Sequence, residues 1–530
     1  MQKKLTDTKT IRAEELAKDQ REISISSFFE KNRHLLGFDN PVRALLTTVK
    51  ELVDNAADAS EEMHVLPEIN VTIEQLAETR FRITVEDNGP GIVKEQIPKI
   101  FAKLLYGSKF FKLKMARGQQ GIGVSASVLY AQLTTGKPTK IISKIDPKKP
   151  AHYYELHIDT QRNEPEIVKE EIIEWEKDHG TKVELELEAK YQKGKQGVFE
   201  YLKQTAIANP HILITYKGPE EEKVEFPRAT NLLPIEPKQI KPHPLGVELG
   251  ILIRMLKGTN ARTLQSFLQT EFCRVGATKA KEVCEEAKLQ PNSRPKRIAR
   301  QEAENLFQAI QKIKFVAPPT DCLSPISASL LEKGLKKEID AEFYVSITRP
   351  PAVYRGFPFQ IECCLAYGGN LDKEGPARLM RFANRVPLLY QQSAGAIAKS
   401  VGATNWKAYN LQQSGRNLPN GPLVIAVHIA SVWVPFTSES KEAIAHYPEI
   451  IKEIRLAVQE CGRQLGKYLR KNIRAKQEKE RINLFERYIP ELASSLAGLS
   501  GEKKKEIEEK LNKTLKKNMS SLLKENGKEE

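Results

Sequence analysis

The feature that most constrains the fold is a long amphipathic helix followed closely by a strictly alternating strand. Asn40 can cap the helix, and Pro41 suits its first turn, where a missing N–H costs nothing. At about 100° per residue, one helix face is apolar: Leu45, Val49, Leu52, Val53 and Ala56. Residues 80–86 alternate, with Phe81, Ile83 and Val85 on one side. With the strands and helices that follow up to Gln204, this pattern predicts an α/β layer.

Two proline-rich breaks divide the rest of the chain. The first spans 234–244 and precedes a helical stretch with glycine-containing turns at 258–260 and 275–278. The second, at 317–321, precedes further strands, which we expect at 343–347, 359–365 and 423–427. From Pro448 onward the chain is predicted to be helical and is rich in Lys, Arg and Glu. The sequence therefore predicts several domains.

Composition narrows the class of protein. The chain carries 83 Lys+Arg and 68 Asp+Glu, a formal net charge of +15, which favours a polyanionic partner such as nucleic acid. A solvated Lys/Glu-rich surface is the alternative that charge alone leaves open. No segment approaches the roughly 18 apolar residues of a membrane span, and the N-terminus is too charged for a secretory signal. The six cysteines include no Cys-x-x-Cys pair, so we expect reduced thiols in a cytoplasmic protein.

The polar face of the first helix carries residues that could activate water or bind a metal ion. Glu51, Asn55 and Asp58 lie close together on the side opposite the apolar residues. A carboxylate and a carboxamide one turn apart could activate water and ligate Mg²⁺, which prefers oxygen ligands. Taken alone, this pattern favours the alternative, an ordinary amphipathic helix with a solvated acidic face.

Two glycine-containing segments follow. Asp87 ends the alternating strand and is followed by Gly89 and Gly91, so its carboxylate can accept from an exocyclic amine while the backbone approaches a ligand. A plain hairpin turn is the alternative. Further on, glycines at 118–123 run into an apolar helix whose free N–H groups can bind phosphate. Alone, each of these signals is weak.

The order of these motifs, together with His179-Gly180-Thr181 before a strand, resembles the GHKL-type (Bergerat) ATPases. The resemblance implies that Glu51 is the general base, Asn55 holds Mg²⁺ and Asp87 binds adenine. The nucleotide contacts that it implies are Asn55, Asp87, Gly89, Gly91, Gly118, Gln119, Gln120, Gly121, Ile122, Gly123, Val124, Ser125 and Thr181. Some relatives carry Lys in place of Ser125, so whether the Ser125 side chain contacts phosphate stays open.

Within that superfamily, residues 25–490 look like the B subunits of topoisomerase VI, a type IIB DNA topoisomerase. The resemblance is carried by segments 50–59, 105–109, 346–350 and 381–388 and by a helix–two-turns–helix insert. It implies that Ser108 and Lys109 contact nucleotide and that Lys441 is a switch lysine reaching the γ-phosphate. We also expect Lys441 to open a helix.

The resemblance also implies partners and a domain order. We expect ATP and Mg²⁺ as cofactors, ATP-dependent homodimerisation, double-stranded DNA as substrate, no membrane, and a nucleoid-associated archaeal-like protein. The chain has no recognisable Asp-x-Asp pair or nucleophilic tyrosine for DNA cleavage, so a partner A subunit in an A2B2 heterotetramer is expected to supply it. The expected parts are an arm (1–25), a GHKL ATP-binding domain (26–235), a helix–two-turns–helix domain (236–316), a transducer domain (317–447), a basic helical stalk (448–490) and a Lys/Glu-rich tail (491–530).

Two other functions share some of these motifs. A sensor kinase would need a phosphoacceptor histidine on an upstream helix, and only His34 precedes the acidic helix. A DNA-scaffolding protein with a degenerate nucleotide pocket would use only the helical insert and the basic tail.

Overall fold

The fold is taken from a computed structural model that describes residues 23–107, 112–118, 121–220, 223–438 and 441–526. The chain divides into two compact units: residues up to Thr404 together with Ser414–Cys461, and Asn405–Gln413 together with the residues from Gly462 onward. Almost the whole of the expected arm, 1–25, lies outside the described residues.

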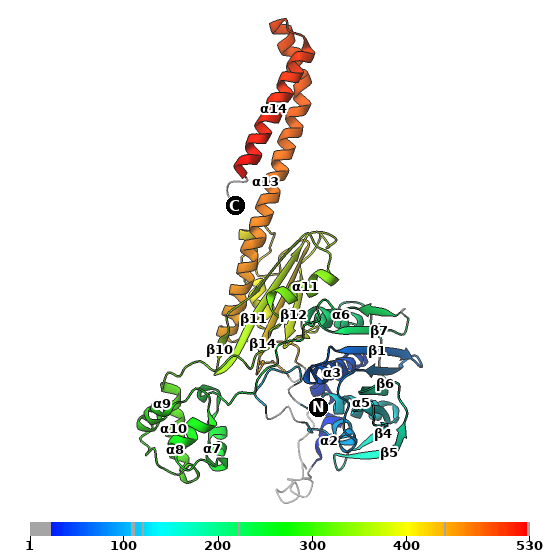
Figure 1. The fold of residues 1–530 in the computed structure, drawn as a ribbon, viewed down its shortest axis with the longest axis vertical. Coiled ribbons are helices and arrows are strands. Elements are labelled where there is room, and N and C mark those ends of the chain that lie inside the picture. The colour runs from blue at the N-terminus through cyan, green and yellow to red at the C-terminus, as the bar shows by residue number, and fades with distance from the viewer. Residues whose placement is uncertain (1–22, 108–111, 119–120, 221–222, 439–440, 527–530) are drawn as a thin grey trace, which may run out of the picture. The chain divides into compact units, whose positions relative to one another are not determined.

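The first unit contains an eight-stranded sheet (Figure 1). Its strands are β1 (Glu68–Gln75), β2 (Arg80–Glu86), β3 (Thr139–Lys144), β4 (Ala151–Asp159), β5 (Glu164–Ile173), β6 (Gly180–Glu188), β7 (Leu213–Lys217) and β8 (Val224–Phe226). Their order is β5-β4-β3-β6-β2-β1-β7-β8. All neighbours pair antiparallel except β1 and β7, which are parallel. In β2 the predicted alternation is confirmed, because every second residue is buried.

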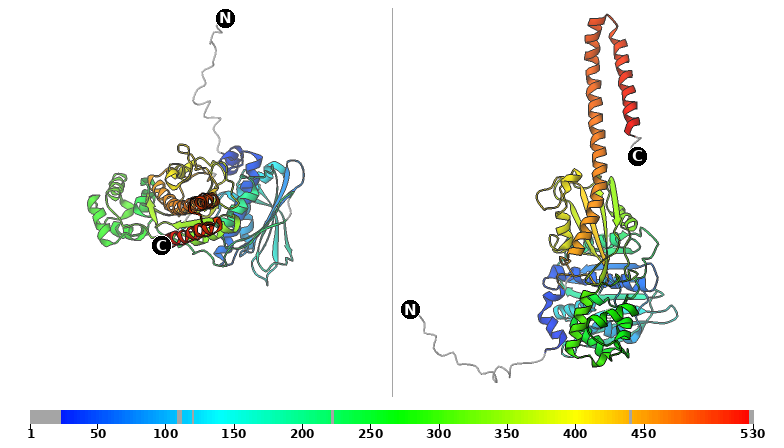
Figure 2. Two further views of the ribbon diagram at one scale, coloured as in Figure 1. Left: turned by 90° about the horizontal axis from the view of Figure 1, so that it is seen from above. Right: turned by 90° about the vertical axis from the view of Figure 1, so that its left-hand side faces the viewer.

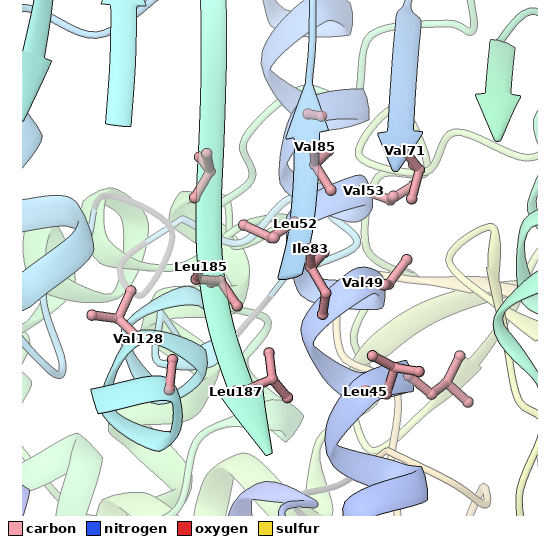
Figure 3. Packing of buried hydrophobic residues seen from close by; sticks show 14 of the residues in the cluster. Leu45, Val49, Leu52, Val53, Val71, Ile83, Val85, Val128, Leu185 and Leu187 are labelled. Carbon is pink, nitrogen blue, oxygen red and sulfur yellow. The ribbon is translucent and has the colours of Figure 1, made fainter. Parts of the chain in front are cut away.

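Helices cover the buried side of this sheet. They are α2 (Ile25–Lys31), α3 (Pro41–Glu62), α4 (Ile97–Ala102), α5 (Gly123–Thr135) and α6 (Val198–Ala208). The predicted start of α3 is confirmed: Asn40 Oδ1 accepts the Arg43 N–H at 2.9 Å, and Pro41 is the first residue. Figure 3 shows the apolar face of α3 and Val128 of α5 packed with side chains from β1, β2 and β6. Register places Ile83 of β2 opposite Leu185 of β6 in this core.

Four helices form a separate core of their own. They are α7 (Leu249–Gly258), α8 (Leu264–Glu271), α9 (Ala277–Glu286) and α10 (Arg300–Lys312). The expected turns are confirmed, because α7 ends at Gly258 and Gly276 caps α9. This group is the predicted helical insert.

A second, six-stranded sheet follows α11 (Ala328–Glu338). Its strands are β9 (Phe343–Thr348), β10 (Ala352–Tyr354), β11 (Phe357–Tyr367), β12 (Arg378–Ala383), β13 (Val386–Pro387) and β14 (Leu423–Ser431), and α12 (Gly395–Gly402) precedes β14. The central strand β14 pairs antiparallel with β11 and parallel with β12, and it is buried along its whole length. The predicted strands are therefore confirmed, and with them an α/β protein of several domains.

Two helices end the described chain. Helix α13 (Pro448–Ser500) continues without a break through Pro490, and α14 (Lys504–Asn526) runs back beside it (Figures 1 and 2). The stalk was expected to end at residue 490 and the tail to begin there. This boundary falls inside α13, because the helix continues through Pro490. In the described part of the chain, no helix is both long and apolar enough to cross a membrane.

Candidate nucleotide-binding site

A cavity of about 1070 Å³ opens beside the polar face of α3. That volume lies just above the usual range of ligand pockets, about 300–1,000 Å³. Glu51 and Asn55, both partly buried, line it from α3, while the helix buries Val49 and Val53 on its other side. The Asn55 Nδ2 donates to the Glu51 carbonyl at 2.8 Å, which leaves the amide oxygen of Asn55 as the atom available to a cation.

Asp58 does not share this cavity, although the helical periodicity placed it near Glu51 and Asn55. It is buried and its Oδ1 lies 2.6 Å from Arg117 Nη1. The interpretation of all three residues as one acidic face is therefore wrong for Asp58, because the three-dimensional packing supplies a buried cation on that side of α3.

The end of β2 brings Asp87 into the same cavity. Its backbone N–H donates to the Thr181 carbonyl at 2.9 Å, and its Oδ1 accepts from the N–H groups of Gly89 at 2.8 Å and Thr181 at 3.2 Å. Burial raises the pKa of Asp87 to about 6, against the opposing effects of those two N–H donors and of Lys177. Asp87 is therefore a buried acceptor whose second oxygen receives no protein N–H in these contacts.

The glycines next to Asp87 have different positions. Gly91 lines the cavity with a φ of +67°, a backbone conformation that favours glycine. Gly89 lies against α3, where a Cβ would meet the Ala59 Cβ at 3.3 Å, and it contributes its amide to Asp87. Thr181 lines the cavity on β6, and its Oγ1 lies 3.2 Å from the Ser143 hydroxyl.

The start of α5 forms the far wall of the cavity. Lining residues from this segment are Gly118, Gly121, Ile122, Gly123, Val124 and Ser125. A Cβ at Gly123 would overlap the Glu51 carboxylate, so the first turn of α5 directly faces Glu51. The Ser125 hydroxyl donates to the Ile122 carbonyl at 3.2 Å. Free N–H groups and the positive end of the helix dipole favour an anion here.

Four predicted contacts cannot be placed in this way. Ser108, Lys109, Gln119 and Gln120 lie outside the described residues.

The second sheet domain also contributes to the cavity. Pro387, Leu388, Leu389, Tyr390, Lys441 and Glu442 line it. Lys441 lies in a loop with a φ of +54°, and the next helix begins only at Pro448. The expectation that Lys441 opens a helix is therefore wrong. Glu442 is buried and forms an ion pair with Arg43 of α3, so α3 binds the loop that carries Lys441.

Sequence reasoning missed several polar residues of this cavity, among them Arg43, Lys50 and Tyr390. Arg43 lies over the Tyr390 ring at 5.1 Å, and both line the cavity together with Lys50. Lys50 adjoins Glu51 within the helix motif, and Tyr390 follows the recognised segment 381–388, so both lay next to a signal. Nothing in the sequence joins Arg43 to residue 442, because that contact depends on how the two domains meet.

Two family models match the chain in the regions that build this cavity. Residues 40–191 match the "Histidine kinase-, DNA gyrase B-, and HSP90-like ATPase" model, and residues 318–481 match "Topoisomerase VI B subunit, transducer".

Whole-chain relatives agree with these matches. The B subunit of type 2 DNA topoisomerase 6 from Methanococcoides burtonii is 52% identical over 486 residues, which cover 92% of this chain and 78% of the relative. The chain belongs to the topoisomerase VI B-subunit family. The corresponding protein from Archaeoglobus fulgidus is 48% identical over 489 residues, covering 92% and 81%, and that from Natronomonas pharaonis is 36% identical over 685 residues, covering 94% and 86%.

As a topoisomerase VI B subunit, the chain is an ATPase subunit of a type IIB DNA topoisomerase. Its ATPase domain binds ATP, and its cavity draws residues from both family regions: Glu51, Asn55 and Asp87 from the first and Lys441 from the second. This membership favours the topoisomerase interpretation over a sensor kinase or a DNA scaffold.

Proposed function

We propose that this B subunit couples ATP hydrolysis in the cavity to the passage of one DNA duplex through another, with cleavage supplied by an A subunit in an A2B2 assembly. The observation that carries the proposal is that Glu51, Asn55, Asp87 and Lys441 line one cavity although they come from two domains. A site shared by two domains can convert the state of the nucleotide into a relative movement of those domains.

Each residue has a distinct proposed role. Asp87 accepts a hydrogen bond from the adenine amine, because its buried carboxylate is held by backbone donors on one oxygen. The N–H groups at the start of α5 bind the phosphates. Glu51, facing that helix start, takes a proton from the attacking water, a step that general-base catalysis commonly accelerates by about 10²–10⁴-fold.

The donor set fits a magnesium ion. Asn55 offers an amide oxygen on the cavity side of α3, which suits a hard cation that keeps several waters and binds few protein ligands. A bound Mg²⁺ would neutralise charge on the phosphates. No cluster of three or more His, Cys, Asp or Glu side chains suited to a metal occurs in the part of the chain that the structure describes, which agrees with a site completed by phosphate and water.

Lys441 is the proposed link between the nucleotide and the second domain. It enters the cavity on a loop that the Arg43–Glu442 ion pair fastens to α3. Contact between its ammonium and the γ-phosphate would be lost on hydrolysis, so the second domain would be released at that point. We propose that ATP binding also joins two B subunits, with the N-terminal arm crossing between them.

The end of α13 supports docking of the A subunit. Six apolar side chains form a stripe on one face of this helix and are more than two-fifths exposed: Leu484, Phe485, Tyr488, Leu492, Leu496 and Leu499. Exposed apolar stripes of this kind mark protein contacts. The basic segment 467–476 precedes the stripe in the same helix, and we propose it as the part of the stalk that leads towards the partner.

Reconstitution tests the proposal. The full chain is co-expressed with an A subunit from a relative, purified as a complex and assayed for decatenation of linked DNA circles with and without ATP. We expect a complex and ATP-dependent decatenation, and a Phe485→Ser/Tyr488→Ser variant that loses the complex but keeps ATP hydrolysis. Arg487→Ser, on the same turn but outside the stripe, is the matched control. Decatenation without ATP, or no complex at all, would contradict the proposal.

A further inference from the structure

A buried cluster of charged side chains lies behind the nucleotide cavity, at the point where its glycine segment begins. Arg117, which directly precedes Gly118, is its centre, with a side chain only 4% exposed. Its Nη1 lies 2.6 Å from Asp58 Oδ1 and 2.9 Å from Glu61 Oε2, and its Nη2 lies 2.5 Å from Glu61 Oε1. Arg117 also donates to Asn209 Oδ1 at 2.5 Å. Hydrogen bonds from both terminal guanidinium nitrogens to carboxylates hold the arginine in one position as well as compensating its charge.

The cluster ties the glycine segment to the helix of the proposed base. Asp58 and Glu61 lie on α3 within three turns of Glu51. Burial would raise the pKa of Glu61, but Arg117, His211 and Arg385 outweigh it and hold that pKa well below its usual range. Both carboxylates therefore act as fixed negative partners of the buried arginines.

The second domain reaches this cluster through one hairpin. Between β12 and β13 the chain turns at Asn384 and Arg385, with φ values of +48° and +68°. Positive φ at both residues is typical of a type I′ turn, in which glycine is strongly preferred at the second position. An arginine there is a strained choice, and strain kept at one residue points to a role for its side chain.

The side chain and backbone of Arg385 both make cross-domain contacts. Its Nη1 lies 3.7 Å from Glu61 Oε2, and its carbonyl accepts from Asn209 Nδ2 at 3.1 Å. The neighbouring Asn384 Nδ2 donates to the Ala116 carbonyl at 3.0 Å, one residue before Arg117. The hairpin thus contacts the backbone one residue before Arg117 and also Glu61, the charge partner of Arg117.

The same hairpin is bound to the centre of its own sheet. The Arg385 N–H donates to His428 Nε2 at 3.0 Å, so the proton of that neutral imidazole lies on Nδ1, which donates to Glu362 Oε2 at 2.8 Å. Glu362 and His428 are fully buried on β11 and β14. These hydrogen bonds tie the hairpin directly to two strands of its own sheet.

We propose that Arg385 is a positioning residue for ATP hydrolysis: through Glu61 and Arg117 it sets where the glycine segment begins, and so couples the second sheet to the phosphate end of the cavity. This inference rests on the proposed nucleotide site. It is a second connection between the domains, separate from Lys441. Arg385 acts through the protein segment proposed to bind the phosphates and makes no direct contact with the nucleotide.

The test uses Arg385→Gly in the full chain, because glycine suits the turn and should leave the hairpin formed. We measure the affinities for ADP and for a non-hydrolysable ATP analogue, and kcat for ATP. We expect the ratio of ATP-analogue affinity to ADP affinity to fall by about tenfold, and kcat to fall at least as much. The melting temperature should fall too, because the variant removes a buried cation that pairs with Glu61 and donates to the Ser324 hydroxyl. A residue with only a structural role would lower both affinities together.

Matched variants make the result decisive. Arg378→Met breaks another cross-domain ion pair, between β12 and Glu200 of α6, and should leave the affinity ratio and kcat as in the wild type. Glu61→Gln combined with Arg385→Gly should be no worse than the more impaired single variant, since residues that act as one unit are non-additive. An unchanged ratio in Arg385→Gly, an equal loss in Arg378→Met, or additive effects would overturn the proposal.

Two further measurements separate the possible failures. If Arg385→Gly does not fold, Arg385→Lys keeps the charge but loses the guanidinium hydrogen bonds to the Ser324 carbonyl and hydroxyl, which hold the side chain beside Glu61. Hydrogen exchange of the amides at 121–126 should then speed up while that of β2 is unaffected. Unchanged exchange there would overturn the inference. Wild-type protein that binds neither nucleotide, or Asp87→Asn protein that binds both normally, would instead contradict the proposed nucleotide site.

Discussion

The protonation and hydrogen bonding of single residues in the cavity depend on how burial affects their polar groups. Asp87 has lost most of its water, yet both of its backbone donors bind the same carboxylate oxygen. Removing a carboxylate from water disfavours its ionised form, and two N–H donors compensate only in part. An incoming amine donor would complete the shell of the second oxygen. The ionised carboxylate of Asp87 would therefore be more stable with an amine donor bound than without one.

This incomplete compensation predicts a pH dependence of nucleotide binding. Burial raises the pKa of Asp87 from 3.8 to about 6, so the folded protein binds the proton more tightly than the unfolded chain. The ionised form therefore lowers fold stability between these two values as pH rises, and protonation removes the acceptor as pH falls. We expect affinity for ADP to drop by at most about tenfold per pH unit below 6.

Calorimetric titrations between pH 5 and 8 would check this expectation. Asp54 needs a control, because burial also raises its pKa to about 6 while its Oδ1 accepts from the Tyr201 hydroxyl at 2.8 Å. Asp54→Asn should keep the pH dependence, whereas Asp87→Asn should bind nucleotide poorly at every pH. Loss of the pH dependence in Asp54→Asn would show that Asp54, and not Asp87, is the titrating residue, and would contradict this prediction.

Glu51 has the clearest catalytic prediction. Glu51→Gln keeps the size of the side chain and removes the proton acceptor, so kcat for ATP should fall by about 10²–10⁴-fold while affinity for nucleotide stays near the wild-type value. Glu74→Gln, an exposed glutamate on β1, serves as the control and should hydrolyse ATP normally. Steady-state hydrolysis retained in Glu51→Gln would remove the proposed base.

At the scale of secondary-structure elements, these residues are positioned where the end of one helix meets the side of another. The first turn of α5 approaches α3 so closely that Gly123 has no room for a Cβ beside the Glu51 carboxylate. Helix α3 is held in turn by an apolar face packed on β2 and β6, opposite its polar residues. The apolar faces of both helices therefore determine the distance between the proposed base and the proposed phosphate site.

A methyl group at this contact should disturb function more than fold. Gly123→Ala would push the Glu51 carboxylate away from the start of α5, and we expect ATP hydrolysis to fall by at least about tenfold. Gly136→Ala at the other end of α5 is the matched control. It has a φ of +64° and open space around it, so it should cost about 1 kcal/mol of unfolding free energy and leave hydrolysis unchanged. Equal activity in the two variants would argue against close approach at Gly123.

At the scale of the whole molecule, the cavity is completed only where two domains of the first unit meet. Lys441 and Tyr390 reach it from the second sheet domain, and Arg43 of α3 contacts both Tyr390 and Glu442. A nucleotide bound there would contact groups from both domains, so its hydrolysis would change the free energy of their contact. This is the physical basis for energy coupling in the proposed enzyme.

Lys441→Ala tests that coupling. We expect the A2B2 complex to form and to hydrolyse ATP, but relaxation of supercoiled DNA per ATP hydrolysed should fall by about tenfold or more, because no side chain then joins the second domain to the γ-phosphate. Lys452→Ala, exposed on α13, should relax DNA normally. Parallel assays of phosphate release and of supercoil relaxation give the ratio, and an unchanged ratio would contradict the role of Lys441.

Much of the fold could be predicted because its signals are local. The Asn40 cap, the five apolar positions of α3 and the alternation of β2 each depend on neighbours within a few residues. The site was indicated by the same local patterns, and Glu51, Asn55 and Asp87 do line one cavity. Two expectations were wrong for one reason: Asp58 meets a buried arginine, and Lys441 lies in a loop that Arg43 holds through Glu442.

By itself, the sequence determined which segments are helices and strands and which residue types stand beside the glycines, because backbone preference and hydrophobic periodicity act over short distances. Only the tertiary structure decided which charges are buried together. Arg117, Glu61 and Arg385 are far apart along the chain, and their pairing depends on the packing of two domains. A buried charge must find its partner in space, and no local pattern records where that partner is.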